Sequence, residues 1–171
     1  SKIGFDYIEL ICDKKSLKDN PINSSSGIQK IIDLVKLNNL KLISVCNNFI
    51  IDNSIWHKKS TYKQNFELIK RIEPLKIQYY ILPLVGKSDF NKIEIQKAKM
   101  ILENISRSLL ELNCQLLIET NLDVDKLKFL IKNIKSKNIS ILYDVGNLSS
   151  LRGQVSYEIE ELGNLIGHIH I

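Results

Sequence analysis

The chain alternates short, continuous apolar runs with longer segments whose apolar residues recur every three or four positions. Continuous apolar runs bounded by turn formers are typical of strands buried on both faces, whereas the longer period is typical of amphipathic helices. The runs predict six strands, the fifth of which ends in a turn: 7–12, 40–46, 77–85, 114–120, 139–147 and 165–171.

Five segments with helical periodicity lie between these runs: 28–37, 62–72, 93–112, 123–136 and 156–163. Asp123 and Asp125 are suited to the first turn of a helix, and Gly163 is suited to a helix end. Residues 18–27 are rich in Ser, Asn and Pro and are expected to form a loop. Pro83 is expected to interrupt the strand over 77–85 near its end.

Strands that alternate with helices predict a parallel α/β protein. Right-handed crossovers allow either an open doubly wound sheet or a closed (β/α)8 barrel, and the number of strands does not separate the two. No strand is followed by a glycine-rich phosphate-binding loop, so neither a dinucleotide-binding nor a P-loop motif is indicated.

Composition describes one globular domain over residues 1–171, with 44% hydrophobic residues and a net charge of +5 from 24 basic and 19 acidic residues. The basic residues form no long run, so a nucleic-acid partner is possible but not required, and none is expected. No apolar stretch is long enough to cross a membrane, and the N-terminal segment does not resemble a signal peptide, which predicts a cytoplasmic location. The three cysteines are too widely spaced for a zinc knuckle.

Polar residues lie near the C-terminal ends of four predicted strands: Glu9, Glu119, Asp144, and the pair His168 and His170. In a barrel these ends meet at one rim, where residues distant in sequence become neighbours. Alternation along the last strand places both histidines on one face, with His170 nearer the rim. The alternative for Glu119 and Asp144 is a structural role as helix N-caps or ion-pair partners.

A Glu, an Asp and a His that converge form a donor set suited to Mn²⁺, Mg²⁺, Co²⁺ or Zn²⁺. We therefore expect one divalent metal ion bound by Glu119, Asp144 and His170. His168 is expected to support the site or to contact the substrate.

Four motifs carry a resemblance that spans nearly the whole chain: GFDYIEL, IETN, YDVGN followed by EIEELG, and IGHIHI. In this order they resemble the sugar isomerase/epimerase family with the xylose isomerase-like barrel. The resemblance implies a (β/α)8 barrel whose metal is held by Glu, Asp, His and a second Glu; Glu119, Asp144 and His170 match the first three. It also implies that residues 1–171 are an incomplete TIM-type barrel of about six β/α units, truncated at both ends, with the strand that supplies the fourth ligand absent.

The family's chemistry implies removal of a proton next to a carbonyl, with Glu119 as a catalytic acid or base as well as a metal ligand. The substrate is expected to be a small sugar or sugar phosphate, contacted by Glu9, Asn147, His168 and Arg152. Asn147 stands where some ketose 3-epimerases have a histidine, and the DVGN motif favours the sugar-phosphate members. A homo-oligomer is compatible with these features.

Two alternatives are weighed against this function. One is an abasic-site endonuclease of the same barrel superfamily, which would need more histidines than the three present. The other is a barrel scaffold or fragment without catalytic activity, which would have no reason to keep the three metal ligands together. Fold resemblance does not fix function.

Overall fold

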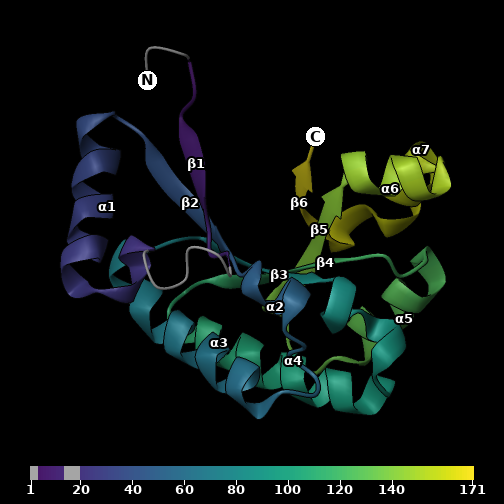
Figure 1. The fold of residues 1–171 in the computed structure, drawn as a ribbon. Coiled ribbons are helices and arrows are strands. Elements are labelled where there is room, and N and C mark those ends of the chain that lie inside the picture. The colour runs from purple at the N-terminus through teal and green to yellow at the C-terminus, as the bar shows by residue number, and fades with distance from the viewer. Residues whose placement is uncertain (1–3, 14–19) are drawn as a thin grey trace.

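The computed structural model describes residues 4–13 and 20–171. Its centre is a curved sheet of six parallel strands, in which each strand pairs with the next along the chain (Figure 1). Consecutive parallel pairing with helices in the connections is the arrangement of a (β/α)8 barrel, so the predicted fold class, an incomplete TIM-type barrel, is confirmed. The strands are β1 (Tyr7–Ile11), β2 (Lys41–Cys46), β3 (Tyr79–Leu84), β4 (Gln115–Thr120), β5 (Ile139–Asp144) and β6 (Ile166–His170).

The helices follow the outer side of the sheet, from α1 beside β2 to α6 and α7 beside β5 (Figure 1). None of the helices formed by the described residues is long and apolar enough to span a lipid bilayer. The helices are α1 (Ser25–Leu37), α2 (Phe49–Asp52), α3 (Lys59–Ile72), α4 (Ile95–Leu110), α5 (Val124–Asn133), α6 (Val145–Arg152) and α7 (Val155–Leu162). Short 3₁₀ turns cover Pro21–Asn23, Glu73–Leu75, Gly86–Ser88, Phe90–Lys92 and Gly163–Leu165.

Apolar side chains of the strands divide between two clusters because successive residues point to opposite faces of a sheet. The larger cluster lies between the sheet and the helices and includes Tyr80, Ile118 and Tyr143. The smaller cluster faces the inside of the curve, which we call the lumen, and consists of Cys46, Ile81, Leu117 and Leu142, with Tyr79 packed against it. Four neighbouring strands thus contribute one buried residue each to the lumen.

Several element boundaries differ from the sequence prediction. Within the loop expected over 18–27, residues 18 and 19 lie outside the described residues, and α1 already begins at Ser25 because the Ser24 hydroxyl accepts a hydrogen bond from the backbone N–H of Gly27 (3.0 Å). Asp123 caps α5, as predicted, by accepting from the N–H of Lys126 (2.9 Å). Pro83 does not interrupt β3: it lies beyond Ile81, where the pairing with β2 ends, so its missing N–H breaks no bond to that strand.

The prediction of a turn after the fifth strand is wrong, because the residues from Val145 to Arg152 form helix α6. Asp144 ends β5 and also caps this helix, since its Oδ1 accepts a hydrogen bond from the N–H of Asn147 (2.7 Å). Leu148 is the buried residue of α6, so the helix has a weak amphipathic pattern. Asp144 is therefore a helix N-cap, which is the structural role that the sequence analysis gives as its alternative to metal binding.

Two irregularities in strand register lie next to the polar rim. Between β1 and β2 the pairing moves from Ile8–Leu42 directly to Glu9–Ser44. Between β5 and β6 it moves from Ile141–Ile166 to Leu142–His168, so that Gly167 is the extra residue. A Cβ at Gly167 would lie 2.8 Å from the Cβ of Ser140, which explains the glycine there.

We expect Gly27→Ala to destabilise the fold, because a Cβ at this position would lie 2.0 Å from the carbonyl oxygen of Pro21. Such overpacking typically lowers the free energy of unfolding by about 1–3 kcal/mol, although alanine otherwise favours a helix. Urea denaturation followed by circular dichroism measures the effect. Ser25→Ala, an exposed change in the same helical turn, serves as the control, and equal stability of the two variants would contradict the prediction.

Candidate active site at the carboxyl rim of the sheet

Ionisable side chains gather on the lumen face at the carboxyl ends of the strands. Glu119 lies two residues after the lumen residue Leu117, and Asp144 lies two residues after Leu142. The β5–β6 register pairs Asp144 with His170, which places both on this face. Alternation and register together therefore bring the three predicted metal ligands to one rim.

The imidazole of His170 lies between two carboxylates that come from different strands. Its Nδ1 is 3.9 Å from Asp144 Oδ2, and its Nε2 is 3.8 Å from Glu9 Oε2. Glu9 is on β1 and His170 is on β6, so the curve of the sheet brings these two side chains from its first and last strands close together across the lumen. Glu9 Oε2 also accepts a hydrogen bond of 2.6 Å from the hydroxyl of Ser44.

The carboxylate of Glu119 accepts a hydrogen bond from a side chain of helix α6. The side-chain amide of Asn147 donates to Glu119 Oε1 (3.1 Å), while its backbone N–H donates to Asp144. Asn147 therefore bridges the two carboxylates.

Burial raises the pKa of Glu119, and the negative charge of Asp144 raises it further. The hydrogen bond from Asn147 and the nearby His170 act in the opposite direction. A carboxyl group whose pKa is moved toward neutrality is better suited to exchange protons near pH 7. The electrostatics thus favour Glu119 as an acid or base.

His168 packs against other rings of the lumen. Its ring lies 5.6 Å from the ring of Tyr79 and makes an edge-on contact with His170, with ring centres 5.4 Å apart. Burial, followed by the proximity of His170, lowers the pKa of His168. The edge-on contact limits the orientation of the His170 ring.

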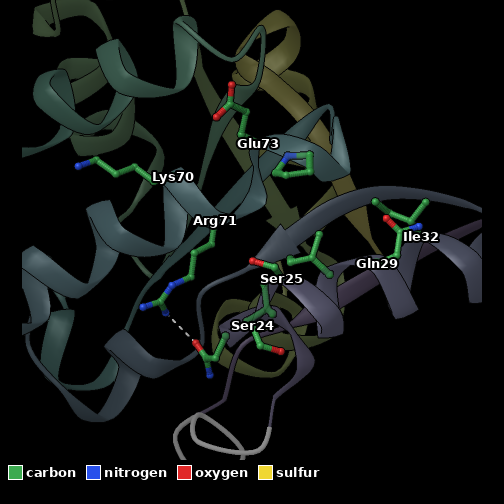
Figure 2. Close-up of a pocket in the computed structure, with 11 residues that line it drawn as sticks. Ser24, Ser25, Gln29, Ile32, Lys70, Arg71 and Glu73 are labelled. Carbon is green, nitrogen blue, oxygen red and sulfur yellow. Dashed lines mark hydrogen bonds between the residues drawn. The ribbon is translucent and has the colours of Figure 1, made fainter.

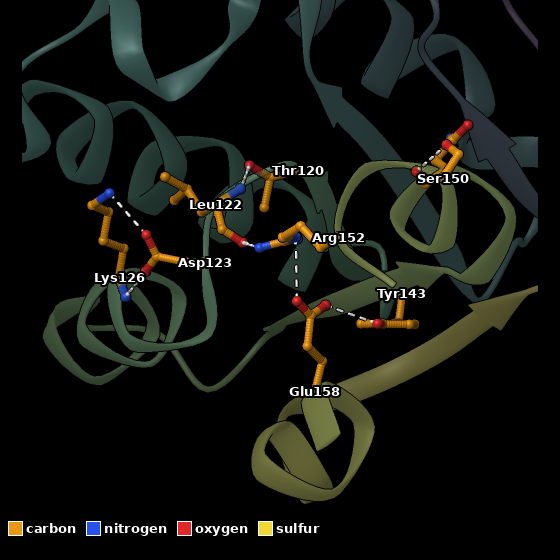
Figure 3. A network of polar contacts seen from close by, with 9 residues as sticks. Thr120, Leu122, Asp123, Lys126, Tyr143, Ser150, Arg152 and Glu158 are labelled. Atoms are coloured by element: carbon orange, nitrogen blue, oxygen red, sulfur yellow. Dashed lines mark hydrogen bonds and ion pairs between the residues drawn. The ribbon is translucent and has the colours of Figure 1, made fainter. Parts of the chain in front are cut away.

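Arg152 is engaged with the outer layer of the structure (Figure 3). Its Nη1 donates to the backbone carbonyl of Leu122 (3.0 Å), and its Nε is 3.2 Å from a carboxylate oxygen of Glu158. The other oxygen of this buried carboxylate accepts a hydrogen bond from Tyr143 (2.8 Å). The observed contacts of Arg152 stabilise a buried charge, and its role in substrate binding stays a prediction.

Ser44 was not identified from the sequence, and neither was the lumen position of Tyr79 and Cys46. Ser44 is an ordinary residue within an apolar run, and only the irregular register of β1 and β2 places its hydroxyl beside Glu9. Cys46 donates its thiol hydrogen to Asn48 Oδ1 (3.0 Å), and burial, with the nearby Glu9 and Glu119, raises its pKa. The thiol is therefore protonated at neutral pH.

The donor atoms at the rim are of the kinds that bind divalent metal ions. Across residues 4–13 and 20–171, no three His, Cys, Asp or Glu side chains already form a group that could hold a metal ion. The donor types of Glu119, Asp144 and His170 nevertheless suit a hard to borderline divalent cation. The repulsion between the two carboxylates, which contributes to the raised pKa of Glu119, is the kind that a cation relieves. The set therefore fits a divalent cation in its chemistry.

A separate pocket of about 430 Å³ lies on the helical outside of the sheet (Figure 2). It is lined by the beginning of α1, including Ser24 and Gln29, and by the end of α3, where Arg71 donates to Asn23 (2.8 Å). None of the rim carboxylates lines this pocket. It therefore contributes nothing to the rim site.

The whole chain, residues 1–171, matches the family model of the xylose isomerase-like TIM barrel. The chain belongs to this family. A comparison with curated protein sequences finds no match. The predicted resemblance to xylose isomerase-like proteins is thus confirmed at the level of the family.

Solved structures of xylose isomerase-like barrels share the fold of this chain. A xylose isomerase domain protein from Planctomyces limnophilus has a TM-score of 0.82 at 10% sequence identity, covering 99% of this chain and 65% of its own. A D-psicose 3-epimerase from Clostridium cellulolyticum H10, solved with D-tagatose, has a TM-score of 0.76 at 16% identity, with 99% and 63% covered. A xylose isomerase-like barrel protein from Mycobacterium smegmatis, in complex with magnesium, has a TM-score of 0.77 at 16% identity, with 99% and 62% covered.

These identities are low, so the similarity shows the fold and does not transfer an activity. The chain spans less than two thirds of the length of each of these three structures.

We expect Glu119→Gln to stabilise the metal-free fold at neutral pH. A carboxyl whose pKa is higher in the folded than in the unfolded state reduces stability above the folded pKa, and this penalty disappears below the unfolded pKa of about 4.3. Glutamine removes the charge and keeps an oxygen that accepts from Asn147. Urea denaturation in EDTA should show a gain at pH 7 that vanishes below about pH 4.

Glu111→Gln is the matched control because Glu111 is exposed. The expected result is no comparable gain at either pH. A stability of Glu119→Gln equal to that of the unmodified protein at pH 7 would contradict the analysis of this carboxylate.

Proposed function

We propose that this chain carries part of the active site of a divalent-metal-dependent sugar or sugar-phosphate isomerase or epimerase. The observation that carries the proposal is the convergence of Glu119, Asp144 and His170, from three neighbouring strands, at the carboxyl rim of the sheet. In barrels of this type the carboxyl rim is where active sites lie. Membership of the xylose isomerase-like family, and the solved epimerase and magnesium-bound barrels with the same fold, support it.

Glu119, Asp144 and His170 would hold the metal ion. When bound, the cation would polarise the substrate carbonyl and stabilise the negative charge that develops on its oxygen. Asn147 keeps Glu119 and Asp144 side by side by donating to both, which reduces the freedom that the two side chains must lose on binding.

Glu119 also accepts the proton from the carbon next to the substrate carbonyl. Its carboxylate takes the proton as the C–H electron pair moves toward the carbonyl. In isomerisation the same group returns the proton to the neighbouring carbon, whereas inversion of the same carbon needs a second acid on the opposite face of the substrate. Burial, the main cause of the raised pKa of Glu119 in the metal-free protein, makes its carboxylate a stronger base, whereas a bound cation would act in the opposite direction. The family resemblance assigns the second acid or base to a Glu on a later strand.

Substrate contacts are assigned to the polar groups that surround this centre. Asn147, His168 and Glu9 present amide, imidazole and carboxylate groups, which bind sugar hydroxyls in complementary donor and acceptor roles. Arg152 is the candidate for a substrate phosphate, and this requires its guanidinium to leave Glu158.

Titration of Mn²⁺ into the metal-stripped protein tests the metal centre. We expect Glu119→Gln, Asp144→Asn and His170→Ala each to weaken Mn²⁺ binding by at least about 10-fold, since even outer partners of a metal ligand contribute 10- to 100-fold. Isothermal titration calorimetry measures the affinity, and circular dichroism checks that each variant is folded. His57→Ala is the control, because His57 is exposed and its ring contacts the carbonyl oxygen of Lys92 instead of the rim.

Proton abstraction is tested by incubating the protein with ketoses and ketose phosphates in D₂O. The expected result is deuterium at the carbon next to the carbonyl, detected by NMR, and its loss in the three variants. Mn²⁺ binding that the variants do not change would reject the site. An absence of binding and exchange in the unmodified protein would favour the scaffold alternative.

A further inference from the structure

A second cluster of polar side chains lies on the helical side of the sheet, behind the end of β2. Asn47 directly follows Cys46, whose side chain is in the lumen, so alternation turns the side chain of Asn47 to the opposite face. There it meets Asn65 of α3 and Tyr80 of β3, and each of the three residues is at most 3% exposed. The proposed mechanism at the rim does not use this cluster.

Hydrogen bonds within the cluster fix the orientation of the Asn65 amide. Its Oδ1 accepts from the hydroxyl of Tyr80 (2.7 Å) and from Nδ2 of Asn47 (3.0 Å). Burial raises the pKa of Tyr80 well above its usual value, so the hydroxyl keeps the proton that it donates. The nitrogen Nδ2 lies on the other side of the Asn65 amide, and it has no hydrogen-bond partner among the described residues. A buried donor without a partner lowers the stability of the fold and calls for an explanation.

A cavity of about 350 Å³ lies beside this amide, and Asn65 is one of the residues that line it. This volume is within the range of about 300–1,000 Å³ that is typical of small-molecule sites. Such sites are mostly apolar with a few placed polar groups. The apolar part of the lining comes from Cys12, Ile22, Phe49 and Leu68.

The charged residues of the lining indicate the charge of the ligand. Glu67 and Arg71 lie one turn apart on α3 and carry opposite charges, so they offset each other. Arg71 also donates to Asn23 (2.8 Å) and lines the pocket of Figure 2, which shares this side of the cavity. The buried end of the cavity offers the uncharged N–H donor of Asn65. An uncharged acceptor matches this lining better than an ion does.

We propose that this cavity binds a small, uncharged molecule with a carbonyl oxygen at one end and an apolar body. The oxygen accepts a hydrogen bond from Asn65 Nδ2, and the body packs against Ile22, Phe49 and Leu68. None of the rim residues Glu9, Glu119, Asp144 and His170 lines the cavity, so the inference does not depend on the proposed function.

Acetophenone is the probe, since it joins a carbonyl oxygen to an apolar ring. Its matched control is α-methylstyrene, in which a CH₂ group replaces this oxygen. Each is titrated into the unmodified protein while ¹H–¹⁵N NMR follows the side-chain amide of Asn65. We expect a saturable shift of this amide with acetophenone and binding of α-methylstyrene that is weaker by at least about 10-fold, because only acetophenone supplies the acceptor.

Gln64→Trp tests the location of the site. Gln64 is exposed and lines the cavity, so an indole at this position takes up cavity volume without replacing a buried amide. We expect this variant to weaken acetophenone binding by at least about 10-fold, as for the loss of a well-packed contact surface. Lys63→Trp is the control, because Lys63 is the exposed neighbour of Gln64 on α3 and does not line the cavity.

Three results would overturn the inference. One is the absence of a saturable shift at the Asn65 amide, which is the outcome expected if water alone satisfies this donor. Another is equal affinity for acetophenone and α-methylstyrene, or tighter binding of benzoate, which carries a charge. The third is an affinity for acetophenone that Gln64→Trp leaves unchanged.

Discussion

The site depends on the curvature of the parallel sheet. Along each strand, successive residues alternate between the two faces of this sheet. The outward face meets the helices and is apolar, so the polar residues of the strands are confined to the lumen face and to the strand ends. Curvature then brings Glu9 of β1 within 3.8 Å of His170 of β6, although 161 positions separate them in the sequence (170 − 9). A flat sheet of the same strands would keep these two side chains apart by the width of four intervening strands.

The carboxylates at the rim are stabilised individually by neutral donors. Glu9 has the Ser44 hydroxyl, Asp144 has a helix N-terminus, and Glu119 has the Asn147 amide. Hydrogen bonds of this kind hold each group in place without neutralising it, so negative charge remains available to a cation or a proton. Burial, and after it the negative charge of Asp144, raises the pKa of Glu119.

The sequence predicts the six strands and the rim residues well, because buried parallel strands have continuous apolar runs and their carboxyl ends share one edge. It fails where structure depends on register or on tertiary contacts. Helix α6 buries little beyond Leu148, so its pattern is weak, and the cap that starts it is the same Asp144 that suggests a metal ligand. The Ser44–Glu9 pair arises from a register shift that the sequence does not encode as a pattern. Arg152 is expected from the sequence to contact the substrate, yet in the structure the buried carboxylate of Glu158 engages it.

The two oxygens of Asp144 have separate duties, since Oδ1 begins helix α6 and Oδ2 faces His170. Asn147, in the first turn of α6, also reaches Glu119. The last residue of the same helix, Arg152, contacts the buried Glu158 of α7. One short helix therefore joins the rim carboxylates at its start to the packing of the outer layer at its end.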